Sequence, residues 1–352
     1  MHWDVNQPDI SIPSDSFLFM HAGITSLEFY LQSSLPLSQT REFLDDIPQR
    51  TPFLTAINVR TAVRVAELEG NICTLLDHLP RLQLISLPKN YLTSRIATAL
   101  STSPALRALQ IGTTWDRGVN VVAPVVPAGG FLSLNKLEVV MPFADAALRI
   151  DAVTTGSALD ELLISSPNRS SDDMKRILDI CANKHRRIRQ LNLECYDNEE
   201  RSSLNFQTFH SLKKLSSLTS INIIHRSPMV MSPAEFTSII SSLTQLTRLC
   251  FNQSPLYCET ASFGLDILPI IARSCKNLTT LKLFLDARLP LPEEEPHTRE
   301  SLFVNLRCLS LGVSVITEET CHPAAMFLST YLPLECELDH GADWVSELRR
   351  TG

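Results

Sequence analysis

The stretch "LQLISLPKNYL" at residues 82–92 follows the pattern L-x-x-L-x-L-x-x-N-x-L, with apolar residues at its first, fourth, sixth and last defined positions and Asn90 at the ninth. A single match means little, because apolar residues make up 44% of the chain. Only a regular recurrence distinguishes a repeat from chance.

The first part of this pattern recurs along almost the whole chain. Matches start at Ile24, Leu54, Leu82, Leu106, Leu134, Leu159, Ile188, Leu218, Leu246, Leu278 and Leu306. Successive starts lie 24 to 32 residues apart, most of them close to 28. Chance matches would scatter widely, so the spacing indicates an array of about eleven repeats.

Each repeat combines the signals of one strand and one helix. Within a match the fourth and sixth positions are apolar and the third and fifth are mostly polar or small, as in a half-buried strand. The segments between matches suit helices, with Ser171, Ser232 and Ser262 as expected N-caps. Such units bury their apolar sides only by stacking, and the returning helix makes neighbouring strands parallel.

The repeat "CKNLTTLKL" (275–283) and the tail "LPLECELDHGADWVSEL" (332–348) carry a family resemblance. The chain resembles leucine-rich repeat proteins of the ribonuclease-inhibitor type, and within them the repeat region of fungal F-box proteins. The resemblance implies an α/β leucine-rich repeat solenoid (horseshoe) with parallel strands on the concave face and helices on the convex face. We expect an N-terminal cap or extension at 1–19, the solenoid at 20–335, and a C-terminal cap and tail at 336–352.

Some features depart from a regular array. In the family, the position of Asn90 often holds Asn or Cys, whose side chain bonds the backbone of the turn. The other repeats hold varied residues there, so we expect an irregular array. Proline-containing segments at 119–130, 226–233 and 286–301 are expected to be loops. The last one carries three consecutive Glu residues and is either a solvated insertion or a partner contact.

No pattern for catalysis, metal binding or cofactor binding is present. The sequence lacks phosphate-binding, dinucleotide-binding, hydrolase and zincin motifs, and its nine cysteines include no C-x-x-C pair. We therefore expect no catalytic, cofactor or metal site. Cys73, Cys181 and Cys275 are expected to be buried thiols, and His210 a surface histidine.

Charge limits the partners. The net charge is −7 and the isoelectric point is about 5.7, which argues against nucleic acid. The basic cluster of Lys184, Arg186, Arg187 and Arg189 follows an expected helix, so we interpret it as contacting the last carbonyls of that helix, with a nuclear localisation signal or an acidic-partner patch as alternatives. No membrane-spanning run or secretory signal is seen, so we expect an intracellular protein, cytoplasmic or nuclear.

The outward positions of the central repeats form the candidate site. They mix amides with charges, as protein-binding surfaces do. We predict partner contacts at Gln190, Asn192, Glu194, Asn222, Arg248 and Lys282. Asn252 is expected on the same face.

We predict a non-catalytic scaffold for protein–protein interaction. The resemblance to F-box proteins implies substrate recognition for an SCF ubiquitin ligase. An F-box is a helical module placed before the repeats, whereas the first repeat here begins near Ile24, so a repeat-only relative, a truncated gene product and a different mode of ligase recruitment remain open. The alternative is a repeat protein that inhibits or regulates an enzyme, as a ribonuclease inhibitor or a GTPase activator does, with Arg60 as the candidate arginine.

Overall fold

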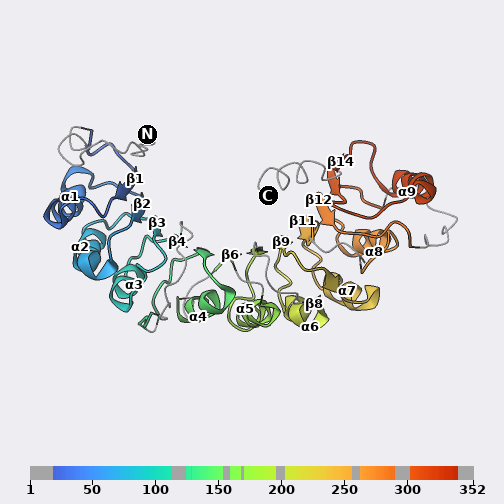
Figure 1. Cartoon of the computed structure of the whole chain (residues 1–352), viewed down its shortest axis with the longest axis horizontal. Coiled ribbons are helices and arrows are strands. Elements are labelled where there is room, and N and C mark those ends of the chain that lie inside the picture. Colours follow the sequence, from blue (N-terminus) through green and yellow to red (C-terminus); the bar gives the residue numbers. More distant parts are fainter. Residues whose placement is uncertain are drawn as a thin grey trace. The chain divides into compact units, whose positions relative to one another are not determined.

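The computed structural model describes residues 19–112, 124–127, 129–153, 159–167, 170–195, 203–255, 262–289 and 302–339. The chain divides into two compact units, unit 1 (residues 1–164) and unit 2 (residues 165–352). The two units are described separately, with the element labels of Figure 1.

Unit 1 alternates strands and helices. Its elements are β1 (Ser26–Leu31), α1 (Leu37–Arg50), β2 (Ala56–Thr61), α2 (Val65–Asp77), β3 (Leu84–Leu87), α3 (Ser94–Ser101), β4 (Ala108–Ile111), β5 (Lys136–Val140), α4 (Phe143–Val153) and the beginning of β6 (Glu161–Ser166). The strands follow chain order in the sheet, and each strand from β1 to β4 pairs in parallel with the next. The helices lie together on one side of this sheet (Figure 1).

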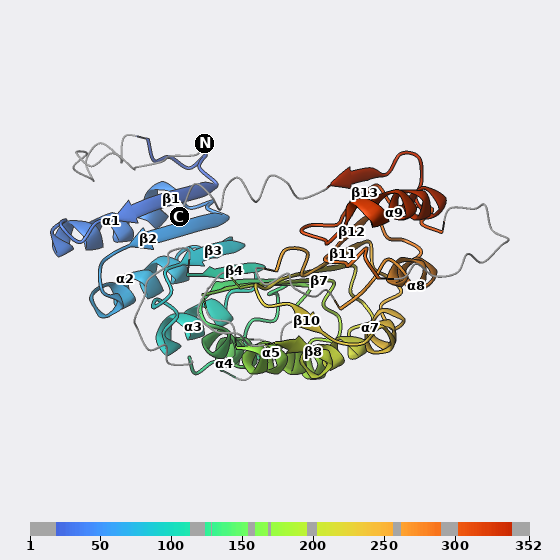
Figure 2. The same ribbon diagram turned by 45° about the vertical axis from the view of Figure 1, so that its right-hand side comes forward.

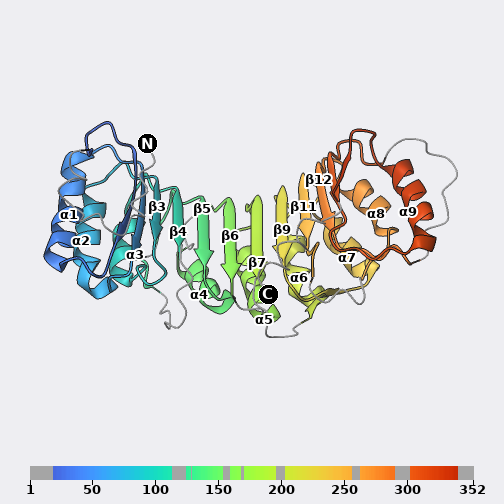
Figure 3. The same ribbon diagram turned by 45° about the horizontal axis from the view of Figure 1, so that its top comes forward.

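Unit 2 repeats this arrangement with more variation. Its elements are α5 (Ser171–Lys184), β7 (Gln190–Cys195), β8 (Leu204–Asn205), α6 (Phe206–Phe209), the 3₁₀ helix η2 (His210–Lys214), β9 (Ser220–Ile224), β10 (Met229–Val230), α7 (Pro233–Ile240), β11 (Arg248–Phe251), α8 (Ile267–Ser274), β12 (Thr280–Leu283), β13 (Cys308–Ser310), α9 (Glu318–Tyr331) and β14 (Glu337–Asp339). The main sheet has the order β7-β9-β11-β12-β13-β14, and all of these pairs are parallel. The helices again cover one side of the sheet (Figure 3).

The repeat pattern is confirmed in every described match. Each of the eleven matches becomes a strand that begins two residues after the start of the match. The strands pair in phase, so that Leu191, Ile221, Leu249 and Leu281 lie side by side, each at most 1% exposed. These rows of apolar side chains between sheet and helices form the core, because neither layer can bury its apolar side without the other.

The predicted helix N-caps are partly right. Ser232 caps α7 in a capping box with Glu235. The cap of α5 is Ser170, whose hydroxyl accepts from the Asp173 N–H, and not Ser171. The prediction of Ser262 as an N-cap was also wrong, because α8 begins only after Asp266. The Ser262 hydroxyl instead donates to the Met229 carbonyl.

Three short strands lie outside the predicted pattern. The segment 226–233, expected to be a loop, contains β10, which pairs in parallel with β8 on the helix side of unit 2 (Figure 2). The third is β14, in the segment expected to be a cap. Its register places Leu338 beside Leu309, which puts Glu335 at the first template position, where the other repeats have an apolar residue. The strands β8 and β10 have two residues each, which is too short for a periodic signal, and the repeat of β14 has a polar residue at a core position.

The turn that contains Asn90 is bonded by a distant arginine. Arg149 on α4 is 2% exposed, and its guanidinium donates to the carbonyls of Lys89 at 3.3 Å and Leu92 at 3.4 Å. Burial lowers the pKa of Arg149 to about 10, against the smaller opposing effect of Asp145. A side chain from a later repeat therefore supplies the backbone bonds that we expected from Asn90.

In unit 2, Asn252 bonds the turn after a strand. Its side chain accepts from the His225 N–H at 2.9 Å and donates to the Ser227 carbonyl at 2.8 Å. Asn252 is 2% exposed, so the expectation that it lies on the outward face was wrong. It follows the end of β11 with φ of 51°, a left-handed conformation that Asn tolerates better than most residues.

Two other expected loops are only partly described. Residues 119–123, 128 and 290–301 lie outside the described residues, and with them the three consecutive Glu residues. The described remainder of 119–130 forms no helix or strand, and Gly129 there has a φ of 75°.

Candidate protein-binding face

Each sheet has one side that the helices leave uncovered. Because strand side chains alternate and the register is in phase, residues at equivalent positions form rows across neighbouring strands. In unit 2 the first row runs Gln190, Ser220, Arg248, Thr280, Cys308 and Glu337, and the second runs Asn192, Asn222, Cys250, Lys282, Ser310 and Asp339. We call these two rows, with Glu194 and Ile224, the unit-2 face. All six predicted contact residues lie on it.

One part of the unit-2 face is a hydrogen-bonded network of two amides and a carboxylate. The Asn222 amide donates to Asn192 Oδ1 at 2.8 Å and to Glu194 Oε1 at 3.3 Å. The Asn192 amide also donates to Glu194 Oε1, at 2.9 Å. All three side chains are half-buried. The network is therefore ordered on the isolated chain and presents a fixed polar surface.

The other part of the unit-2 face is cationic. Arg248 and Lys282 lie on the neighbouring strands β11 and β12, and both flank Cys250. Burial raises the pKa of the Cys250 thiol, while Lys282 and Arg248 oppose that shift. Among the described residues, neither cation forms an ion pair. No described carboxylate therefore competes with a partner for either charge.

Sequence reasoning missed Cys250 and did not select Ser310 as contact residues. Both are buried, at 6% and 1% exposure, although they belong to the second row of the unit-2 face. Cys250 resembles a core residue in the sequence. The in-phase spacing of the repeats is the signal that could have placed it beside Asn222 and Lys282.

The open side of the unit-1 sheet, which we call the unit-1 face, has its charges paired. Arg60 on β2 contacts Glu28 on β1 at 2.8 Å, and Lys136 on β5 contacts Glu161 on β6 at 3.6 Å. Gln110 on β4 donates to the Glu138 carboxylate on β5 at 3.0 Å. The acids of this face are therefore engaged within the sheet.

The three cysteines that we expected to be buried lie in the core, and His210 lies on the surface. Cys73, Cys181 and Cys275 are buried, as predicted. Burial raises the pKa of Cys181 and of Cys275 to about 12, which keeps both thiols protonated and weakly nucleophilic. His210 is exposed and meets the edge of the Phe206 ring, which confirms a surface histidine. Over the described part of the chain, no group of three or more His, Cys, Asp or Glu could hold a metal.

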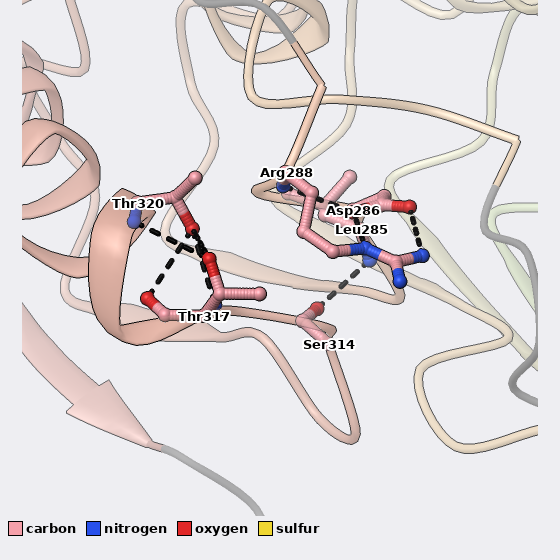
Figure 4. A network of polar contacts seen from close by, with 6 residues as sticks. All are labelled: Leu285, Asp286, Arg288, Ser314, Thr317 and Thr320. Atoms are coloured by element: carbon pink, nitrogen blue, oxygen red, sulfur yellow. Dashed lines mark hydrogen bonds and ion pairs between the residues drawn. The ribbon is translucent and has the colours of Figure 1, made fainter.

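Two positions equivalent to Asn90 do stabilise turns, near the C-terminal end of unit 2 (Figure 4). The Asp286 carboxylate accepts from the Arg288 guanidinium at 2.7 and 2.9 Å, and this bonding lowers the pKa of Asp286. The Ser314 hydroxyl accepts from the Leu285 N–H at 2.8 Å. Thr317, which follows, caps α9. The bond between Ser314 and Leu285 joins two adjacent repeats, whereas the side-chain contacts of Asp286 and Thr317 are local.

The basic cluster lies at the end of α5, as predicted. The Arg186 guanidinium donates to the Ala182 carbonyl at 3.0 Å, in the last turn of that helix. Lys184, Arg187 and Arg189 are exposed beside it. The contact of Arg186 confirms the helix-terminal interpretation for that residue.

Comparisons with known proteins assign the chain to no family. No family model matches the chain, and no curated protein matches it. Among solved structures, a leucine-rich repeat-containing protein, LegL7 from Legionella pneumophila, is similar with 17% identity, a TM-score of 0.43 and coverage of 80% of both chains. No helix within the described ranges has the length and apolar character needed to cross a membrane.

The fold follows from the chain's own repeats. Strands recur about every 28 residues, pair in parallel and in phase, and are mostly followed by helices on one side of the sheet. Each unit thus has the α/β fold of a leucine-rich repeat protein.

Proposed function

We propose that this chain is a non-catalytic scaffold that binds a partner protein through the unit-2 face. One observation carries the proposal: side chains from six adjacent strands form two regular rows that join an ordered amide network to two cations that pair with no carboxylate of the described residues. Repeat arrays commonly use such long uncovered sheet surfaces for binding. Mixed charge with amides is the chemistry of a protein interface.

The absence of catalysis is part of the proposal. Burial raises the pKa of the Cys181 and Cys275 thiols and keeps them protonated, and the buried His225 accepts from the Ser227 N–H at 3.0 Å as part of a turn. These groups therefore support a structural role, and an enzyme would need a nucleophile or a general base with access to substrate.

Substrate recognition for an SCF ubiquitin ligase is the finer form of the proposal. Its support is the sequence resemblance to fungal F-box proteins. Regulation of an enzyme is the alternative, but its candidate arginine is engaged, because Arg60 contacts Glu28 at 2.8 Å. An activator arginine has to reach a partner's reacting phosphate, so this ion pair favours the scaffold.

The test is a triple variant of the unit-2 face. Asn192→Ala, Arg248→Ala and Lys282→Ala together should reduce recovery of the partner in affinity purification with mass spectrometry and leave the melting temperature nearly unchanged, because partly exposed polar substitutions usually cost about 0.5 kcal/mol or less each. A matched control makes the same three kinds of substitution on the unit-1 face, Asn58→Ala, Arg60→Ala and Lys136→Ala.

The proteins recovered distinguish the finer proposals. Ligase subunits that are lost from the unit-2 variant and retained by the unit-1 control support SCF substrate recognition. A stoichiometric enzyme with the same dependence supports regulation. Unchanged recovery with the unit-2 variant would show that this face is not the binding surface.

A further inference from the structure

We infer that the cationic part of the unit-2 face binds an acidic segment of the partner protein through its Asp or Glu carboxylates. This inference rests on the proposed function and names the chemistry of the partner. The residues that carry it are Arg248, Thr280, Lys282 and Ser310, which we call the donor cluster. They come from the three adjacent strands β11, β12 and β13.

The register brings the donor cluster together. Arg248 lies opposite Thr280, and Lys282 lies opposite Ser310. Adjacent strands are about 4.8 Å apart and successive residues about 3.3 Å apart along a strand, so the backbones of the four residues fall within about 12 Å of one another. Two of these side chains are cations that only donate hydrogen bonds, and the other two are hydroxyls that can donate. A carboxylate only accepts, and it is the complementary group.

Ser310 is a second, independent indication of a ligand. The residue is 1% exposed, yet its hydroxyl has no hydrogen-bond partner among the residues that the structure describes. A buried polar group without a partner costs free energy that a bonded one does not. A carboxylate bound beside Lys282 would supply the missing acceptor in the same row. The donor cluster is therefore incomplete on the isolated chain and complete with an acid bound.

The surrounding charges limit the length of the acidic segment. Glu194 on β7 lies on one side of the donor cluster, and Glu337 and Asp339 on β14 lie on the other side. A long polyanion such as nucleic acid, extended along the rows, would meet these carboxylates and be repelled. A short acidic segment of a protein places its charges on the two cations and avoids both flanks.

The experiment is a selection of short random peptides, displayed on phage, against the purified full chain. Enriched peptides should contain an excess of Asp and Glu. After resynthesis, their affinity should fall by about tenfold or more with Lys282→Glu, and by a similar factor when their acids are replaced by Asn and Gln. Lys282→Gln provides a second variant, which removes the charge without introducing repulsion.

The matched control is Lys276→Glu. Lys276 belongs to the same repeat as Lys282 and is exposed, but it precedes β12 and lies outside the unit-2 face. This variant should leave peptide affinity unchanged, and the melting temperature of every variant should match that of the wild type.

The outcomes separate this inference from the proposed function. Failure to enrich any peptide, peptides without an acidic excess, or acidic peptides that bind the two Lys282 variants as well as the wild type would each overturn the acidic-segment inference. If non-acidic peptides were enriched and lost affinity for the triple variant, the unit-2 face would remain the binding surface. Only the inference that its ligand is acidic would then be wrong. Peptides insensitive to the triple variant would contradict both.

Discussion

The unit-1 face and the unit-2 face are built from the same repeat but differ in whether their cations form ion pairs within the sheet. On the unit-1 face, Arg60 and Lys136 each contact a carboxylate on a neighbouring strand. On the unit-2 face, Arg248 and Lys282 form no ion pair with any described residue. The core positions of the two sheets are equivalent, so stacking of the repeats requires neither the paired charges of the unit-1 face nor the cations of the unit-2 face, which pair with no described carboxylate.

This difference indicates that the outward strand positions, and not the core positions, determine what each sheet can bind. The first, fourth and sixth template positions form the core in both units, and the outward third and fifth positions are free to vary. Charges that are paired within the sheet already neutralise one another. Cations without an ion pair are attracted more strongly to an acidic partner. The difference in charge pairing therefore favours the unit-2 face as the binding surface.

The largest expected effect comes from breaking the core that the two units have in common. Leu191→Asp in β7 would place a charge at a position that is 1% exposed, and we expect it to cost more than about 4 kcal/mol and to prevent stable folding. Chemical denaturation or soluble yield measures this effect. The control is Gln190→Asp, the preceding residue, whose side chain is exposed and should tolerate the change.

The same variant tests whether the units form one solenoid, which remains a prediction. If residues 20–335 unfold as a single array, Leu191→Asp should also reduce the hydrogen-exchange protection of β3 and β4 in unit 1. Full protection of unit 1 in this variant would instead show that the units are independent in stability.

The next effect concerns the buried Arg149 of unit 1 and its hydrogen bonds to the turn after β3. Arg149→Ala removes the donors that bond the Lys89 and Leu92 carbonyls, together with the packing of a buried side chain. We expect a loss of about 2 to 4 kcal/mol in the free energy of unfolding. Arg107→Ala, an exposed arginine of the same unit, should change it by about 0.5 kcal/mol or less. Equal effects of the two substitutions would contradict a structural role for Arg149.

A smaller effect is the pH dependence of a buried thiol in unit 2. Burial raises the pKa of Cys181 from 9.0 to about 12, so the folded state keeps a proton that the unfolded state releases. This contribution is complete below about pH 9 and is lost as the pH rises toward about 12. The stability difference between wild type and Cys181→Ala should therefore become less favourable to the wild type by about 1 kcal/mol between about pH 8 and about pH 10.

Urea denaturation at the two pH values measures this change. Cys321 is exposed, so Cys321→Ala is the control for removing a thiol that is not buried. A shift of the same size for both variants would mean that burial of the thiol is not its cause.

The smallest effect is expected at the ion pair of the unit-1 face. The Arg60 and Glu28 side chains are 43% and 21% exposed, so solvent screens their attraction. A double-mutant cycle with Arg60→Gln and Glu28→Gln should give a coupling of less than about 1 kcal/mol. A larger coupling would mean that charge pairing contributes to the stability of unit 1, and the comparison of the two faces would then concern stability as well as binding.

Much of the candidate site could be predicted from the repeats alone. All six predicted contact residues lie on the unit-2 face, because alternation within a strand and a constant spacing between strands are both visible in the sequence. Asn252 was misplaced because it lies one residue beyond the end of β11, where the chain turns and alternation no longer applies. β14 was missed because Glu335 occupies a position where the other repeats have an apolar residue.

The sequence by itself determined the repeat, the parallel strands and the division of each strand into core and outward positions, because apolar spacing is a local property. Only the tertiary structure decided which outward groups satisfy one another. Arg60 meets Glu28, Asn222 meets Asn192, and Arg149 reaches the turn at Lys89 across separations of about 30 to 60 residues. Such contacts depend on side-chain direction and on the detailed path of each turn, and neither is encoded in the spacing of the leucines.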